Sequence, residues 1–180
     1  SNDRKPDMSS ERAFIPLRIS VLTISDSRTE ADDRSGNLLV QRLTDAGHGL
    51  HARRIVPDDI YRIRAVLSDW IADPVCTVVL TTGGTGVTGR DGTPEAVSPL
   101  LDKTIDGFGE MFRVLSYDQI KTSTLQSRAL AGVANGTYLF CLPGSPSACG
   151  TGWDMLISAQ LDYRTRPCNL VELMPRLLER

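Results

Sequence analysis

The sequence lacks the features of several large classes of protein. No apolar stretch approaches the roughly 18 residues that a membrane-spanning helix needs. Residues 1–12 are polar and have no apolar centre of the kind found in a secretory signal peptide. None of the four cysteines forms a C-x-x-C pair, and the two histidines have no acidic partner at metal-ligand spacing. These absences argue against membrane insertion, secretion, a zinc site and a disulfide framework, and they predict a cytoplasmic protein.

An excess of one charge is also missing. Twenty Lys and Arg residues stand against 22 Asp and Glu residues, which gives a formal net charge of -2 and a pI near 5.7. Nucleic-acid-binding domains are usually basic, so we expect no nucleic-acid partner. Small anionic substrates remain open, because backbone amides and a few arginines can hold a phosphate inside an acidic protein.

The size and composition suit one globular domain. The chain has 180 residues, of which 41% are hydrophobic and 23% charged, and such a chain can bury a core without metal or disulfide support. We therefore expect a disordered tail over residues 1–13 and a single α/β domain over residues 14–180.

Predicted strands and helices alternate along this domain. Short apolar runs rich in β-branched residues predict strands at 18–25, 52–56, 75–82 and 137–142. Apolar residues at helical spacing predict helices at 34–46, 60–71, 107–122 and 147–161. A further helix is expected to open at Thr93-Pro94, with Thr93 as its N-cap, whereas residues 164–180 are too mixed to assign. The alternation predicts a three-layer α/β sandwich with a mostly parallel central sheet.

The polar loops that follow the predicted strands indicate where a ligand binds. In parallel sheets, ligands bind outside the carboxyl ends of the strands, where the strand order reverses. Loops 25–33, 81–92 and 143–147 lie at those ends and contain most of the glycine, serine, threonine and acidic residues. The sequence therefore predicts the functional site at this edge of the sheet.

The glycine-rich segment 81–89 favours anion binding over a merely flexible turn. Glycine allows positive φ angles and lets an anion approach the backbone amides, and the threonine hydroxyls add donors. Residues 84–89 match the dinucleotide-binding pattern G-x-G-x-x-G, but Arg90-Asp91-Gly92 separates them from the next helix. The same segment lacks the Lys-Ser/Thr pair of a P-loop, so both of these motifs are rejected.

Individual polar residues near these loops allow two interpretations. Asp91 suits either a turn or a magnesium ligand, because Mg²⁺ takes one or two carboxylates together with water and phosphates. Asp58 has the same two interpretations, and capping of the following helix by Asp58 or Asp59 is favoured on local grounds. Arg128 is more typical of a surface ion pair than of a phosphate ligand. The Gly144-Ser145 turn before a helix is the better anion candidate.

Taken in order, several segments resemble the MoaB/MogA family of molybdenum-cofactor biosynthesis proteins. They span residues 15–169, and residues 124–128 and 165–169 are most similar to the bacterial MoaB branch. Each segment is short, but the ordered set is specific: Ser25-Asp26, Thr81–Gly86, Asp91–Ala96, Gly107–Glu110, Ser127-Arg128 with Ala131-Gly132, and Leu142–Pro146.

The resemblance implies a molybdopterin-binding α/β domain that uses Mg²⁺ and ATP. In active members, the terminal phosphate of molybdopterin attacks the ATP α-phosphate, pyrophosphate is released, and adenylylated molybdopterin is formed. Asp58 and Asp91 match the two acidic active-site positions, where they would bind Mg²⁺ and orient the reacting phosphates. Further positions carried over by the resemblance would bind phosphate or pterin: Thr82, Gly83, Gly84, Thr85 and Gly86 in the loop, Ser127, Arg128, Gly144 and Ser145 on the molybdopterin side, and Asp26 as an additional polar contact.

Two other functions are considered beside the adenylyltransferase. A noncatalytic molybdopterin-binding or carrier protein would use the same cleft, although retention of both acidic residues favours the enzyme. An NAD-dependent oxidoreductase is disfavoured by the interrupted glycine pattern. The resemblance also implies a homo-oligomer, a hexamer or a trimer, and transient contact with other molybdenum-cofactor enzymes.

Overall fold

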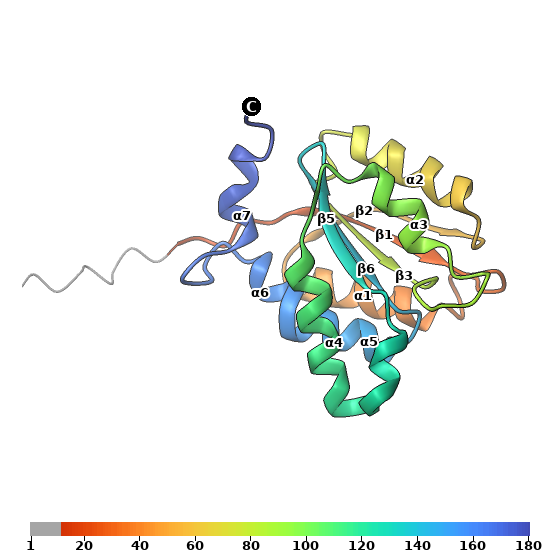
Figure 1. Ribbon diagram of the computed structural model, residues 1–180. Helices are drawn as coiled ribbons and strands as arrows, with labels where there is room; N and C mark the ends of the chain where they lie inside the picture. Colours follow the sequence, from red (N-terminus) through yellow and green to blue (C-terminus); the bar gives the residue numbers. More distant parts are fainter. Residues whose placement is uncertain (1–11) are drawn as a thin grey trace, which may run out of the picture.

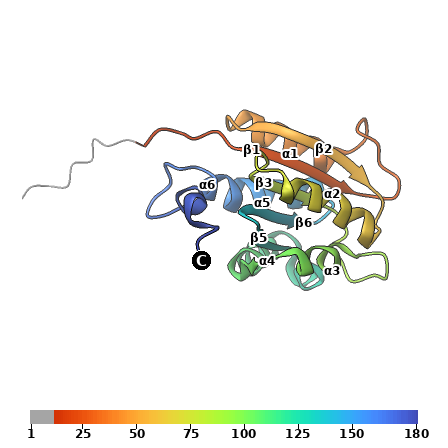
Figure 2. The ribbon, with the colours of Figure 1, turned by 90° about the horizontal axis from the view of Figure 1, so that it is seen from above.

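The computed structural model describes residues 12–180, which form a six-stranded sheet with helices on both faces (Figure 1). The strands lie in the order β2-β1-β3-β6-β5-β4, and Figure 2 shows them following one another from β2 to β5. The first four in this order are parallel, whereas β5 and β4 are antiparallel to their neighbours. Their bounds are β1 Arg18–Ile24, β2 Gly49–Val56, β3 Val78–Thr82, β4 Lys103–Thr104, β5 Leu130–Ala134 and β6 Thr137–Leu142. The mostly parallel sheet is thus confirmed.

Within residues 12–180, seven α-helices connect or follow these strands. Helix α5 continues through a π-helical segment, Trp153–Ile157, into α6. A 3₁₀ segment, Lys121–Gln126, follows α4, and two shorter ones occupy Ser98–Leu100 and Met174–Arg176. The helix bounds are α1 Arg34–Asp45, α2 Ile60–Ala72, α3 Thr93–Val97, α4 Asp106–Ile120, α5 Pro146–Gly152, α6 Ser158–Gln160 and α7 Leu170–Leu173.

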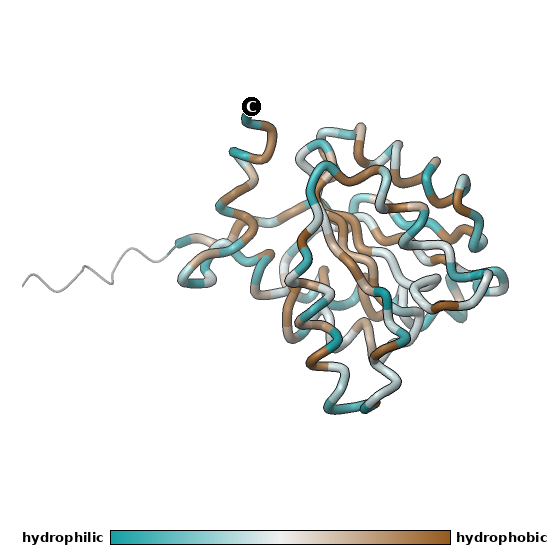
Figure 3. The backbone as a smooth tube through the Cα atoms, in the orientation of Figure 1, coloured by the Kyte–Doolittle hydropathy of each residue, from teal (hydrophilic) through white to brown (hydrophobic). Residues whose placement is uncertain are grey.

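The central strands bury apolar side chains on both faces. Successive residues of a strand point to opposite sides of the sheet, so Val21 and Leu80 pack in the core beneath α1, α4 and α5. Leu22 and Val79 pack in the other core, beneath α2 and α3. Figure 3 accordingly shows the strands as a hydrophobic centre. The three-layer α/β sandwich predicted from the sequence is confirmed.

The structure differs from the sequence-based prediction in the second half of the sheet. Strands β4 and β5 were not predicted, and β5 runs antiparallel to β6. Its sequence, Leu-Ala-Gly-Val-Ala, has few of the bulky residues that mark a strand. Gly132 is required there, because a Cβ at this position would lie 2.6 Å from the carbonyl oxygen of Lys103. In addition, β2 begins at Gly49 rather than at residue 52, and β3 begins at Val78 rather than at residue 75.

Two helix termini also differ. The prediction that Thr93 caps α3 is wrong: Gly92 occupies the cap position, and the Thr93 hydroxyl donates to the carbonyl oxygen of Gly83 at 2.8 Å. Helix α4 ends at Ile120 rather than at residue 122, because Lys121 adopts a positive φ of 55°. The C-terminal segment that could not be assigned contains the short helix α7.

Several predicted absences can be compared with the described part of the chain. All four cysteines are free, and three of them are buried. Residues 12–180 contain no cluster of three or more His, Cys, Asp or Glu that could hold a metal ion. None of the helices in this range has the length and apolar character needed to cross a membrane. Most of the predicted N-terminal tail, residues 1–11, lies outside the described residues.

Candidate functional site

The strand order brings three loops together at one edge of the sheet. From β1 the chain passes to β2 on one side and later to β3 on the other, so the order reverses between β1 and β3. The carboxyl ends of β1, β3 and β6 therefore lie side by side, as expected for a ligand-binding crevice. Two cavities open there, and both are lined by Ile24 and Gly144.

The first cavity, which we call the glycine-loop cavity, has a volume of about 520 Å³. This volume lies within the range of roughly 300–1,000 Å³ that is usual for small-molecule sites. The predicted site residues that line it are Gly83, Gly84, Thr85, Gly86, Asp91, Ser127, Gly144 and Ser145. Four predicted residues, Asp26, Asp58, Thr82 and Arg128, are not part of its wall, and their positions are described below.

One wall of this cavity was missed by the sequence analysis. It is formed by Ser116, Gln119 and Ser123, from α4 and the 3₁₀ segment that follows it. The amide of Gln119 donates to the hydroxyl of Thr151 at 3.0 Å, which fixes α4 against α5. The signal in the sequence was a polar stripe at helical spacing, a pattern that more often marks a solvated helix face.

The glycine loop allows two carboxylates to lie against the backbone. Gly83 and Gly84 have φ angles of 106° and 71°, in the region that favours glycine. A Cβ at Gly84 would lie 2.9 Å from Oδ2 of Asp58, and a Cβ at Gly86 would lie 2.6 Å from Oδ2 of Asp91. The missing side chains of these two glycines thus create the space that the two acidic residues occupy.

Asp91 is an ionised carboxylate held by its own loop. Oδ2 accepts hydrogen bonds from the amide and the hydroxyl of Thr88, at 2.9 and 2.8 Å. Partial burial raises the pKa of Asp91, but the hydrogen bonds from Thr88 and from the Gly86 amide outweigh it, so the pKa is below its usual value. Asp91 therefore presents a negative charge at the wall of the glycine-loop cavity.

Asp58 lies beside the same loop, outside the cavity wall. Its Oδ1 accepts from the amide of Gly92 at 3.1 Å, and its Oδ2 faces Gly84. Burial raises the pKa of Asp58, and the negative charges of Asp91 and Asp26 raise it further, whereas the Gly92 amide lowers it. Asp59, not Asp58, caps α2, because its carboxylate accepts from the amides of the first turn. The competing interpretation of Asp58 as a helix cap is therefore wrong.

Asp26 connects the β1 loop to the glycine loop. Its Oδ1 accepts from Nη2 of Arg90 at 2.7 Å and from the amide of Asp58 at 3.0 Å. The hydrogen bond from Arg90, followed by the one from the Asp58 amide, lowers the pKa of Asp26. Asp26 thereby brings the loops that follow β1, β2 and β3 into contact.

The other two predicted residues contact the protein itself. Thr82 is fully buried, and its hydroxyl donates to the carbonyl oxygen of Pro143 at 2.8 Å. The three guanidinium nitrogens of Arg128 each donate to a protein acceptor: Nε to the carbonyl of Gly86, Nη2 to the carbonyl of Asp91, and Nη1 to Oε1 of Glu95. Its cationic group is thus directed at the loop and at α3.

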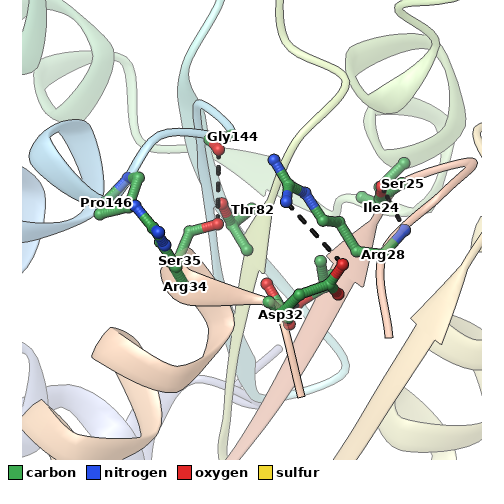
Figure 4. Close-up of a pocket in the computed structure, with 11 residues that line it drawn as sticks. Ile24, Ser25, Arg28, Asp32, Arg34, Ser35, Thr82, Gly144 and Pro146 are labelled. Atoms are coloured by element: carbon green, nitrogen blue, oxygen red, sulfur yellow. Dashed lines mark hydrogen bonds and ion pairs between the residues drawn. The ribbon is translucent and has the colours of Figure 1, made fainter. Parts of the chain in front are cut away.

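The second cavity, which we call the β1-loop cavity, lies between the β1 loop and the first turn of α1 and has a volume of about 500 Å³. Figure 4 shows Arg28 and Arg34 around it, with Ser35 donating to the carbonyl of Gly144 at 3.4 Å. Its floor includes Asp33, whose buried carboxylate accepts from the Thr23 hydroxyl at 2.6 Å. Both arginines are exposed, so this cavity combines a buried acid with cationic side chains at its mouth.

Comparison with known proteins shows which family this chain is similar to. Residues 20–163 match the model of a family described as a probable molybdopterin binding domain. Molybdenum cofactor biosynthesis protein B of Escherichia coli (strain K12) is 54% identical over 156 residues, which cover 87% of this chain and 92% of that protein. The protein of the same name from Bacillus cereus is 46% identical over 151 residues, covering 83% of this chain and 89% of the relative.

Solved structures agree with this result. A crystal structure of a Molybdenum cofactor biosynthesis protein B has a TM-score of 0.81 and 44% identity, and the match covers 83% of this chain and 94% of that one. The tungsten cofactor synthesizing protein MoaB from Pyrococcus furiosus has a TM-score of 0.72 and 39% identity, with coverage of 79% and 91%.

Proposed function

The chain belongs to the molybdopterin-binding domain family of molybdenum cofactor biosynthesis proteins, and from this membership we propose that it adenylylates molybdopterin. An oxygen of the terminal phosphate of molybdopterin attacks the α-phosphorus of ATP and forms a new P–O bond. The bond from the α-phosphorus to the bridging oxygen breaks, and pyrophosphate leaves with the bonding electrons. The products are adenylylated molybdopterin and pyrophosphate.

The observation that carries this proposal is the pair of carboxylates against the glycine loop. Asp58 and Asp91 approach the backbone at Gly84 and Gly86, where an added Cβ would lie 2.9 and 2.6 Å from their Oδ2 atoms. Neither caps a helix. A transfer between phosphates requires in-line positioning and charge neutralisation, with little covalent participation by the protein. The backbone amides supply hydrogen-bond donors, and the two carboxylates supply ligands for a cation. Such a transfer needs both.

The donor set fits Mg²⁺. This ion prefers oxygen ligands and takes one or two carboxylates, while water and substrate phosphates complete its shell. Asp91 is ionised, and Oδ2 of Asp58 lies beside Gly84 while Oδ1 is occupied by the Gly92 amide. When bound, Mg²⁺ would neutralise charge on the phosphates. Asp58 and Asp91 would hold the ion and orient the phosphates.

The remaining residues bind and orient the two substrates. The amide of Gly84 and the hydroxyl of Thr85 would contact phosphate groups, whereas the amide of Gly83 donates to the carbonyl of Leu142 and that of Gly86 to Asp91. Ser127, Gly144 and Ser145 line the same cavity, where they would contact molybdopterin. Asp26 holds the Asp58 amide and so supports the acidic pair.

The test is adenylyl transfer by the purified protein. Molybdopterin, ATP and Mg²⁺ are mixed with the protein, and pyrophosphate release is followed. We expect turnover that requires both molybdopterin and Mg²⁺ and falls by at least about 100-fold in Asp58→Ala and Asp91→Ala. Asp69→Ala, which removes an exposed acid from α2, is the control and should leave the rate unchanged.

The opposite result would identify a carrier. If the wild-type protein binds molybdopterin tightly but releases no pyrophosphate, we would conclude that it is a noncatalytic binding protein in the same pathway. Family membership also leads us to propose a homo-oligomer, a hexamer or a trimer, and light scattering that gave a monomer would refute it.

A further inference from the structure

Arg128 was expected to contact molybdopterin, but its surroundings indicate another role. We infer that Arg128 is a positioning residue: its guanidinium holds the two ends of the segment from Gly86 to Asp91 and so shapes the phosphate-facing wall of the glycine-loop cavity. The inference rests on the proposed function of that cavity, and it assigns to Arg128 no contact with substrate.

The contacts of the guanidinium connect three parts of the chain. Nε lies 2.8 Å from the carbonyl oxygen of Gly86, and Nη2 lies 2.9 Å from that of Asp91. Nη1 lies 2.5 Å from Oε1 of Glu95 in α3. Because the guanidinium is planar and its donors have fixed directions, these three acceptors are held at fixed positions relative to one another. The backbone amide of Arg128 adds a fourth contact, to the carbonyl of Thr85 at 2.9 Å.

Arg128 is itself held in place by α4. Nη1 of Arg113 donates to the carbonyl of Ala129, the next residue along the chain, at 2.9 Å. Gly109 makes room for this contact, because a Cβ there would lie 2.5 Å from the same carbonyl oxygen. The segment that carries Arg128 is therefore fixed to a long helix before its side chain reaches the loop.

A second arginine also anchors α3. Arg64, from α2, donates to the carbonyl oxygens of Ala96 at 3.0 Å and Glu95 at 2.8 Å. Glu95 is thus held through its backbone by Arg64 and through its side chain by Arg128. Arg64 therefore connects α3 to α2, while Arg128 connects α3 to the segment from Gly86 to Asp91.

The contacts of Arg128 are made mainly to the protein. Three of the five N–H donors of its guanidinium are directed at Gly86, Asp91 and Glu95. Its charge is also already paired, because the hydrogen bond from Arg128 lowers the pKa of Glu95 and keeps that carboxylate ionised. The side chain serves the site by fixing the loop that binds the phosphate.

The first experiment measures the loop directly and needs no substrate. Amide hydrogen exchange is compared in wild type, Arg128→Ala and Arg128→Lys. Since a lysine cannot reproduce the forked contacts, both variants should exchange the amides of residues 86–92 at least about tenfold faster. Arg42→Ala is the matched control, because Arg42 also pairs with an exposed carboxylate, Asp154, at 2.9 Å. It should leave the loop unchanged, and slow exchange of β3 in every variant would show that the fold is retained.

The second experiment separates positioning from binding by the direction in which one substitution changes loop exchange and substrate affinity. Glu95→Gln removes the carboxylate that pairs with Arg128 and lies outside both cavity walls. If Arg128 only positions the loop, Glu95→Gln should speed loop exchange and lower kcat. If Arg128 binds substrate, this variant releases the guanidinium, so the affinity for Mg-ATP or molybdopterin should rise while loop exchange stays unchanged, which would overturn the inference.

Steady-state kinetics complete the test. We expect kcat to fall about 100-fold in both Arg128→Ala and Arg128→Lys, the scale of loss that follows a small misplacement of catalytic groups, while the KM for molybdopterin changes much less. Full activity of Arg128→Lys together with a raised KM in Arg128→Ala would refute positioning. Unchanged loop exchange in Arg128→Ala would also refute it, even if adenylyl transfer is established. Faster loop exchange in the Arg128 variants of a protein that shows no turnover would support the positioning role of Arg128 and contradict the proposed adenylyltransferase activity.

Discussion

Arg53 and Asp33 form an ion pair beneath the β1-loop cavity, with Nη2 of Arg53 lying 3.1 Å from Oδ2 of Asp33. The Asp33 side chain is only 1% exposed, and it also accepts from the hydroxyl of Thr23 and from the amide of Gly36 at the start of α1. One buried carboxylate therefore joins β2, β1 and the first turn of α1.

Removal of this carboxylate should destabilise the fold strongly. Asp33→Ala leaves the largely buried guanidinium of Arg53 without its partner, and it removes the N-cap of α1. We therefore expect a loss of about 3–5 kcal/mol in the free energy of unfolding. Urea denaturation measures it. Asp154→Ala, which breaks the exposed pair with Arg42, is the control and should cost less than about 1 kcal/mol. Equal losses in the two variants would contradict the special position of Asp33.

The stability of the protein should depend on pH through His48. Burial lowers the pKa of His48 below its ordinary value of 6.5, against the opposing charge of Asp162. Its Nδ1 accepts from the amide of Leu17 at 3.0 Å, which requires an unprotonated nitrogen. The folded state therefore binds this proton less readily than the unfolded state. The contribution of His48 is complete above pH 6.5 and is lost as the pH falls through the folded pKa.

Denaturation midpoints between pH 7.5 and 5 test this dependence. The wild-type midpoint should fall on acidification. His48→Gln removes the titrating group and should flatten the profile. An unaltered slope in His48→Gln would assign the pH dependence to other groups.

Gly84 and Gly89 belong to the same loop but should respond differently to alanine. Gly84 has a φ of 71°, a conformation that costs a non-glycine residue about 1–2 kcal/mol, and an added Cβ would crowd Oγ1 of Thr93 and Oδ2 of Asp58. Gly84→Ala should therefore lower both the stability and the rate of pyrophosphate release. A Cβ at Gly89 would meet no atom within 4 Å. Gly89→Ala should change the stability by less than about 0.5 kcal/mol, and similar effects at the two positions would contradict the geometry of the loop.

The cap of α2 gives a further test. Asp59 accepts from the amides of Tyr61 at 3.0 Å and Arg62 at 2.9 Å, so Asp59→Ala should cost about 1 kcal/mol in thermal or urea unfolding. Asp69→Ala, near the end of the same helix, removes no cap. It should be nearly neutral, and a cost as large as that of Asp59→Ala would argue against the capping role.

The fold was predictable where a segment is buried and regular. Strands β1 and β6 and helices α1 and α2 show their burial as periodic apolar residues, and they lie within a few residues of the predicted bounds. Strand β5 gave no such signal, because alanine and glycine at its centre form no bulky apolar run, and Gly132 lies close to Leu101 and Lys103. Its pairing depends on β6 and is a tertiary property.

The site was predictable as a set of loops but not as a set of contacts. The carboxyl ends of the strands and their glycines located the first cavity, and the resemblance supplied the residues. The bonds of Arg128 to Gly86 and Glu95 join residues more than 30 positions apart, and no local pattern reports such a contact. The α4 wall at Ser116 and Gln119 was missed for the same reason.

The position of β6 in the sheet determines when the edge of β3 can be covered during synthesis of the chain. β3 is buried along its whole length and pairs with β6 on one edge, yet β6 follows it only after α3, α4 and β5. A growing chain therefore exposes an apolar strand edge until residue 142 has been synthesised, and such edges template wrong association. Because the amide of Gly83 donates to the carbonyl of Leu142, this contact of the glycine loop forms only after β6 has been made.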